Sequence, residues 1–358
     1  MNMQSLEKLG FNKLLQDQVD SSQMVDFKIA RVIAVNKNSF IVSDGEKDIF
    51  AELTGKFLFN SDSPLDYPAV GDWVYVQLFD DDSFAVIHEL FPRKSLLKRK
   101  TPGKKIEYQL IAANVDTALI MQSVDNNFNL RRLERYLVMV YESNIKPIVL
   151  LSKCDLVSSD EIKAREAEIH KLIQDIPVVA FSNYNPAEIE NVKILLNAGE
   201  TFCLLGSSGV GKTTLLNNLI HEELYKTQAI REKDGRGRHT TTRRELIVLE
   251  NGAMVVDNPG MRELGVISNE TGLSSIFDEI VELISHCRFT DCSHTHEEDC
   301  AILKGIESGL ITKERYNNYL KMLKEAAYHE MSYIERRKKD RSFGKFIHSV
   351  LKHKKDKQ

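Results

Sequence analysis

At positions 206 to 213 the chain reads Gly206-Ser207-Ser208-Gly209-Val210-Gly211-Lys212-Thr213, and this stretch decides the fold. It follows the apolar run 202–205 and precedes the apolar segment 215–220. A strand, a glycine-rich turn and a helix in this order are typical of a P-loop, in which backbone N–H groups and the positive end of a helix surround a phosphate. We expect these residues and Thr214 to bind a nucleotide, Lys212 to act catalytically on the outer phosphates, and Thr213 to bind Mg²⁺.

The composition is typical of a globular protein with two or three domains, since 42% of the 358 residues are hydrophobic and 28% are charged. Glu7 and Lys8 interrupt the region where a signal peptide needs an apolar run, and no stretch of about 18 apolar residues follows. We therefore expect a cytoplasmic protein without a membrane segment.

The charge is unevenly distributed along the chain, whose net charge is −4. Residues 331–358 contain ten basic and three acidic residues. An acidic body with a basic tail predicts a polyanionic partner such as nucleic acid, although a solvated, frayed terminus is the alternative. The low hydrophobicity beyond Lys338 predicts a tail that becomes ordered only on binding, if at all.

The N-terminal region, residues 1–95, predicts a short amphipathic helix and a small β-barrel. The helix is expected over 5–16, with Leu6, Leu9 and Leu14 on its apolar face. Short strands with turn signals between them are expected over 27–35, 40–43, 49–53, 72–79 and 84–90. This pattern favours an OB-fold, whose face either binds RNA or serves as a structural spacer.

The composition of residues 96–108 indicates a linker, because 96–105 is polar and basic with Pro102-Gly103. An α/β domain is expected over 109–270, where apolar runs alternate with helical patterns, as in a mostly parallel sheet covered on both faces. A further strand over 246–249 should pair antiparallel through the Asn251-Gly252 turn. Residues 271–358 show helical patterns only, over 273–287 and 313–334, and form the last predicted domain.

Two further elements are typical of a GTPase. Asp257-Asn258-Pro259-Gly260 closes a strand, as does the DxxG element that senses Mg²⁺ and the γ-phosphate through Asp257 and Gly260. The loop 237–242 contains His239 and three threonines, of which we expect Thr241 to bind Mg²⁺ and to act in catalysis.

Guanine is normally read by an Asn-Lys-x-Asp element after a strand, and here Ser152, Lys153 and Asp155 stand at these positions. We expect Asp155 to discriminate guanine from adenine, and Ser152 to offer the base edge a shorter hydrogen bond than asparagine would. A backbone contact to the guanine oxygen is expected at Ser182-Asn183. The reader precedes the P-loop, which predicts a circularly permuted domain.

The segment 287–300 predicts one structural Zn²⁺, because it supplies three thiolates and an imidazole, a complete tetrahedral set. The ligands are Cys287, Cys292, His294 and Cys300, with His296 as a rival fourth ligand. Free buried thiols are the alternative.

Together, these motifs resemble the circularly permuted, small-subunit-dependent GTPases of the RsgA (YjeQ) family over nearly the whole chain. The resemblance rests on the segments 109–116, 125–137, 206–213, 237–242, 257–264 and 287–300. It implies an OB barrel, a permuted P-loop GTPase domain and a helical zinc-binding domain.

The same resemblance implies hydrolysis of GTP to GDP and phosphate, stimulated by the small (30S) ribosomal subunit during its late maturation. It also implies rRNA contacts from the barrel and from the C-terminal domain, and we expect a monomer. The chain departs from the family at Ser152, usually Asn or Thr, and at Asn258, usually Thr. Met261 occupies the place of the water-orienting glutamine of many GTPases, for which the family's suggested substitute is His239.

Two other functions remain open at this point. An RNA-binding scaffold would hold nucleotide with little turnover, and subunit-stimulated hydrolysis would distinguish it from a GTPase. A P-loop kinase or ATPase is opposed by Asp155, and competition between GTP and ATP would decide that question.

Overall fold

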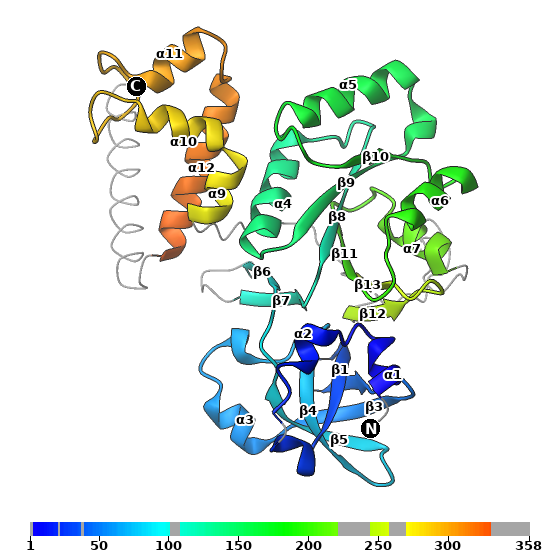
Figure 1. Cartoon of the computed structure of the whole chain (residues 1–358). Helices are drawn as coiled ribbons and strands as arrows, with labels where there is room; N and C mark the ends of the chain where they lie inside the picture. Colours follow the sequence, from blue (N-terminus) through cyan, green and yellow to red (C-terminus); the bar gives the residue numbers. More distant parts are fainter. Residues whose placement is uncertain are drawn as a thin grey trace, which may run out of the picture. The chain divides into compact units, whose positions relative to one another are not determined.

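The computed structural model describes residues 3–20, 22–36, 39–100, 108–220, 244–257 and 270–330 (Figure 1). The chain divides into two compact units, Met1–Gly265 and Val266–Gln358. Within the described residues, no helix is both long enough and apolar enough to cross a membrane. The first unit contains both a barrel and an α/β sheet, and the second contains helices.

The predicted barrel is confirmed. Its strands follow one another in the order β1-β2-β3-β5-β4, and β4 returns to pair with β1, which closes the sheet. Only β3 and β5 pair in parallel. Alternate side chains point inward because successive residues of a strand face opposite sides, and Val32, Val42, Ile49, Val74 and Ile87 form its core. The strands span β1 Lys28–Val35, β2 Phe40–Ser43, β3 Asp48–Leu53, β4 Trp73–Phe79 and β5 Phe84–Leu90.

The single N-terminal helix expected over 5–16 is wrong. Two short helices, α1 (Met3–Glu7) and α2 (Lys13–Gln16), replace it, because Gly10 between them has φ +84°. Leu14 is consequently 72% exposed, whereas Leu6 and Phe11 pack beneath Trp73 on the outside of the barrel. A further helix, α3 (Gly55–Asn60), follows β3.

The predicted α/β domain is confirmed as a mostly parallel sheet in the order β10-β9-β8-β11-β13-β12. Its helices lie on both faces, with α6 and α7 packed on one and α4 on the other (Figure 1). The strands are β8 Thr117–Ser123, β9 Lys146–Ser152, β10 Val178–Ala180, β11 Thr201–Gly206, β12 Arg244–Val248 and β13 Met254–Asp257. The helices are α4 Leu130–Glu142, α5 Ser159–His170, α6 Pro186–Ile194 and α7 Lys212–Ile220.

The predicted antiparallel pairing of β12 with β13 is confirmed, but β12 is not an edge strand. Its other side pairs with β1 of the barrel, where Ala34 lies opposite Glu245 and Val35 opposite Arg244. The barrel and the α/β domain therefore share one continuous hydrogen-bonded sheet.

The linker predicted over 96–108 is wrong for its first residues. A strand, β6 (Leu96–Lys100), pairs antiparallel with β7 (Tyr108–Ala113). Polar side chains form hydrogen bonds between the two strands, as Arg99 Nε does to Gln109 Oε1 at 2.9 Å. Such cross-strand pairs stabilise β6, although its composition alone predicts a loop. The division into 1–95, 96–108, 109–270 and 271–358 otherwise stays a prediction.

The second unit is helical in its described part, with α9 (Glu270–Ile276), α10 (Asp278–Ser285), α11 (Ala301–Glu307) and α12 (Lys313–Glu330). The helix expected over 273–287 is interrupted at Phe277, whose φ of −122° and ψ of 38° are not helical. The Phe277 ring is fully buried and packs edge-on against Tyr319 at a centroid distance of 5.5 Å. Residues of the basic tail lie outside the described part.

A buried arginine, Arg31 on β1, joins the barrel to the α/β sheet. Its guanidinium donates to the Gly71 carbonyl at 3.2 Å and to Thr201 Oγ1 at 2.8 Å, and it also bonds the Leu9 carbonyl. The Trp73 ring lies 5.3 Å from the guanidinium carbon. Burial lowers the pKa of Arg31 to about 10, so the side chain remains charged at pH 7.

We predict that Arg31→Met destabilises the first unit by about 2–4 kcal/mol, because it leaves buried acceptors without donors. Trp73 is the single tryptophan of the chain and is buried between the outside of the barrel and the N-terminal residues, so its fluorescence during urea unfolding measures the effect. The matched control is Arg131→Met on the exposed face of α4, which should leave the unfolding midpoint unchanged. Equal midpoints for both variants would contradict the role given to Arg31.

Candidate nucleotide site and metal centre

The P-loop connects β11 to α7, and its glycines are required by its geometry. Gly206, Gly209 and Gly211 have φ of +145°, +81° and +97°, a region that other residues rarely adopt. A Cβ on Gly206 would also lie 2.6 Å from the Met121 carbonyl oxygen. Side chains at these positions would therefore open the turn that directs backbone N–H groups toward one point.

Lys212, the first residue of α7, has its ammonium inside this turn. Its Nζ donates to the Gly206 carbonyl at 2.6 Å and to the Ser207 carbonyl at 2.8 Å. Burial lowers the pKa of Lys212 to about 8, and the nearby Asp257 carboxylate partly opposes that shift. Among the described residues, this ammonium donates to these two neutral carbonyls, and such a buried cation is suited to anionic phosphates. Thr213 and Thr214 lie in the same first turn of α7.

The guanine-reading element lies beside the P-loop. Ser152 ends β9, is fully buried, and donates its hydroxyl to the Val210 carbonyl at 2.6 Å. This hydrogen bond connects the loop after β9 to the P-loop backbone. A hydrogen bond from Ser152 to the base edge stays a prediction.

Asp155 follows on an exposed turn, where its carboxylate accepts a hydrogen bond from Ser182 Oγ at 2.6 Å. Ser182 and Asn183 come directly after β10, and Asn183 Nδ2 donates to the Gly211 carbonyl at 3.3 Å. The loops after β9, β10 and β11 are thus connected by side-chain hydrogen bonds at one edge of the sheet. This is the convergence that the sequence predicts for a guanine nucleotide.

Asp125, after β8, contacts the predicted reader residue Lys153, although no sequence motif assigned it to the site. Its Oδ2 accepts from Lys153 Nζ at 2.8 Å, while its Oδ1 accepts from Ser123 Oγ and from the Asn127 backbone. Partial burial alone would raise the pKa of Asp125, but these bonds, led by that of Lys153, lower it to about 2. Lys153 itself has φ +63°, in the left-handed region that residues other than glycine adopt infrequently.

Asn127 continues this connection to the P-loop. Its Nδ2 donates to Ser207 Oγ at 3.2 Å, and Arg132 from α4 bonds both oxygens of Asn127. The segment 125–137 carries part of the family resemblance, and that was the only signal in the sequence for these residues. No motif gives an Asp at this spacing a role, because its charged partner, Lys153, comes from another loop.

The predicted switch residues lie outside the described part of the chain. These are His239, Thr241, Asn258, Gly260 and Met261. Asp257 is described and ends β13, which pairs in parallel with β11. The assignments of His239, Thr241 and Gly260 stay predictions.

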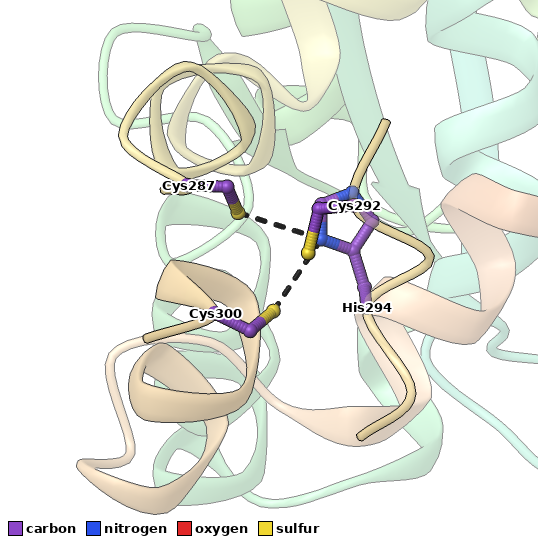
Figure 2. A group of neighbouring side chains, drawn as sticks. All are labelled: Cys287, Cys292, His294 and Cys300. Carbon is purple, nitrogen blue, oxygen red and sulfur yellow. Dashed lines mark hydrogen bonds between the residues drawn. The ribbon is translucent and has the colours of Figure 1, made fainter. Parts of the chain in front are cut away.

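The second unit contains a cluster of four metal-binding side chains. The ligand atoms of Cys287, Cys292, His294 and Cys300 all lie within 4.8 Å of one another, and Figure 2 shows the side chains pointing to a common centre. His294 Nδ1 lies 3.5 Å from Cys287 Sγ and 3.4 Å from Cys300 Sγ. The rival ligand His296 is exposed and lies outside this group, with its Nδ1 2.7 Å from Thr295 Oγ1.

These distances fit one tetrahedral ion. Zn–S bonds of about 2.3 Å place two sulfurs of a tetrahedral site roughly 3.8 Å apart, and a sulfur and a nitrogen somewhat closer. Three thiolates and one imidazole leave no position for water, so the donor set is typical of structural rather than catalytic zinc. Cys300 caps α11 and Cys287 follows α10, so an ion here would join these two helices.

Comparison with known proteins identifies relatives along the whole chain. The family model for RsgA GTPase matches residues 90–267. A "Small ribosomal subunit biogenesis GTPase RsgA 2" of Vibrio parahaemolyticus is 37% identical, covering 99% of this chain and 94% of that protein. An "RsgA 1" of the same description from Bacteroides thetaiotaomicron is 38% identical and covers 98% of each chain.

Two solved structures are similar in fold. YjeQ from Thermotoga maritima aligns with a TM-score of 0.61 and 26% identity, covering 84% of this chain and 99% of that one. YloQ, described as a circularly permuted GTPase, aligns with a TM-score of 0.56 and 24% identity over 86% and 97% of the two chains.

The order of the loops defines the class of protein. The segment predicted to read guanine follows β9 and precedes the P-loop after β11 and the Asp257 strand, which is the order of a circularly permuted GTPase. The chain belongs to the RsgA GTPase family.

We predict that Asp125→Asn weakens GDP binding about fivefold, because it removes the charge at Oδ2 while Oδ1 can still accept from Ser123 and Asn127. In a Lys153→Met background the same substitution should have no further effect, which a double-mutant cycle measured by calorimetry tests. Glu190→Gln, which removes the exposed partner of Lys193, is the matched control. Additive effects of Asp125→Asn and Lys153→Met would show that Asp125 does not act through the lysine.

Proposed function

We propose that this protein hydrolyses GTP to GDP and phosphate on the small ribosomal subunit, which stimulates the reaction, and that it acts in late maturation of that subunit. The observation that carries the chemistry is the set of hydrogen bonds between three loops: Ser152 bonds the P-loop, Ser182 bonds Asp155 of the predicted reader, and Asn183 bonds the P-loop. The partner is supported by the relatives, which are described as small ribosomal subunit biogenesis GTPases.

In this proposal each loop has one task. The Asp155 carboxylate accepts hydrogen bonds from the guanine edge, and the backbone of 206–213 surrounds the phosphates. Lys212 leaves its carbonyl partners for the outer phosphates, where its charge stabilises the developing negative charge. Thr213 and Thr241 would hold Mg²⁺, which neutralises phosphate charge when bound, and Asp257 and Gly260 would complete the DxxG contact.

His239 is proposed to orient the attacking water. Met261 has no hydrogen-bonding side chain for this task, so another residue must supply it. The loop 237–242 carries this histidine, and the ribosomal subunit would increase turnover by holding the loop against the γ-phosphate.

The remaining assignments follow from the second unit and the tail. Zinc in the four-ligand cluster would stabilise the helical unit, while the ten basic residues of 331–358 would contact rRNA phosphates. We further propose that the protein is a cytoplasmic monomer.

Turnover of GTP by the wild type should increase when purified small subunits are added and should not respond to large subunits. Lys212→Ala should lose about 100-fold or more of the activity, because one preorganised cation at the phosphates is removed. His239→Ala should retain nucleotide affinity but lose the stimulation by subunits. Wild-type turnover that is unaffected by small subunits would favour the RNA-binding scaffold instead.

Elemental analysis should find one zinc ion per chain, and none in Cys300→Ser. Loss of zinc should unfold the second unit, because the metal joins α10 to α11, and circular dichroism should show reduced helix content. Cys154→Ser, outside the cluster, should retain the ion. Unchanged zinc content in Cys300→Ser would contradict the ligand set.

A further inference from the structure

The outer surface of the barrel carries three phenylalanines in one row. Phe50 on β3 lies opposite Phe84 on β5, and Phe84 lies opposite Phe79 on β4. Their neighbours Ile49, Ala51, Ala85 and Leu78 point into the barrel core, so by strand alternation the three rings point outward. The strands that carry them are adjacent in Figure 1.

These rings form a connected apolar surface. The centroids of Phe50 and Phe84 are 6.1 Å apart with nearly parallel planes, and those of Phe79 and Phe84 are 6.4 Å apart. Phe50 and Phe79 are each 42% exposed. The N-terminal helices cover Trp73 and Tyr75 on the same barrel, but they do not bury this row. Adjacent exposed aromatic rings in a soluble protein often mark a binding surface.

Carboxylates surround the row. Asp48 and Glu52 flank Phe50 on the outer face of β3, and Asp80 and Asp81 follow Phe79 in the β4–β5 turn. Within the described residues, none of these four carboxylates has an ion-pair partner, whereas Asp82 bonds Lys28 and Lys47 at 3.4 Å each. The local charge is therefore negative.

The sign of this charge decides between two partners. Aromatic rings on an OB barrel can stack with bases, but binding of single strands also requires a positive groove for the phosphates. Here the phosphates would meet the carboxylates of Asp80 and Asp81. Arginine and lysine side chains instead gain from both features, since they bind aromatic faces and carboxylates alike.

We propose that the surface formed by Phe50, Phe79 and Phe84, with the carboxylates of Asp48, Glu52, Asp80 and Asp81, binds an arginine- and lysine-bearing polypeptide segment. This surface is separate from the nucleotide site. It assigns this face of the barrel a polypeptide partner rather than RNA.

The proposal is tested with the full-length protein and a fluorescein-labelled arginine-glycine repeat peptide, followed by anisotropy. Phe50→Ser with Phe79→Ser should weaken peptide binding about tenfold, because two exposed cation–π contacts are lost. Asp80→Asn with Asp81→Asn should weaken it similarly. Asparagine tolerates the positive φ of 51° and 53° at these positions, so the turn is preserved.

The controls remove exposed carboxylates and an exposed apolar side chain at other places on the protein. Asp175→Asn with Glu250→Gln removes two exposed charges outside the barrel, and Ile194→Ser removes a side chain that is 71% exposed. Both should leave peptide affinity unchanged, and all variants should retain wild-type GDP affinity.

Three outcomes would overturn the proposal. Peptide affinity that is the same in wild type and both barrel variants would place the peptide elsewhere. Loss of oligouridylate binding in the phenylalanine variant, with peptide binding intact, would make the row a platform for RNA. A wild-type dimer in sedimentation experiments that dissociates in the phenylalanine variant would assign the surface to a second copy of the chain.

Discussion

Parallel pairing of β8, β9 and β11 is the constraint on which the nucleotide site depends. The register places Gly206 beside Met121 and Ser123 beside Ser152, so the carboxyl ends of the strands lie level at one edge. Loops that leave this edge can contact one ligand whatever their order in the chain. The permutation therefore changes which segments are joined covalently, but not which side chains meet.

At this edge, three side-chain hydrogen bonds connect the loops. Ser152 bonds the Val210 carbonyl, Ser182 bonds Asp155, and Asp125 bonds Lys153. Each bond joins a residue of the predicted reader to a neighbouring loop, so the reader is positioned before a base binds. This preorganisation lowers the conformational entropy that is lost on binding. Ser152, where the chain departs from the family, connects its loop to the P-loop backbone.

The barrel is an extension of the same sheet. Strand β12 follows the segment predicted to contain the switch, and it pairs with β13 on one side and with β1 on the other. Arg31 adds a buried connection to Thr201 at the start of β11, the strand that leads to the P-loop. The barrel and the nucleotide-binding sheet therefore belong to one compact unit.

Local sequence determined the elements and their chemistry. The strands of the barrel, the P-loop and the Cys/His spacing were predicted from alternation, glycine positions and ligand types, which are properties of neighbouring residues. Predictions from local patterns were wrong at Gly10 and at residues 96–100. At Gly10 a left-handed backbone ends a helix, and at 96–100 a basic segment becomes a strand because 108–113 pairs with it.

The site shows the same division. The sequence by itself indicated a GTPase and a cluster of four metal-ligand side chains, and it predicted a guanine reader, because each motif is short and carries its chemistry within a few residues. Only the tertiary structure decided that Ser152 bonds the P-loop, that Asp125 holds Lys153, that His294 rather than His296 joins the cysteines, and that three phenylalanines share one surface. Those contacts depend on the register of the strands and on which loops lie close together in space. Short sequence patterns do not contain this information, because the contacting residues are far apart in the chain.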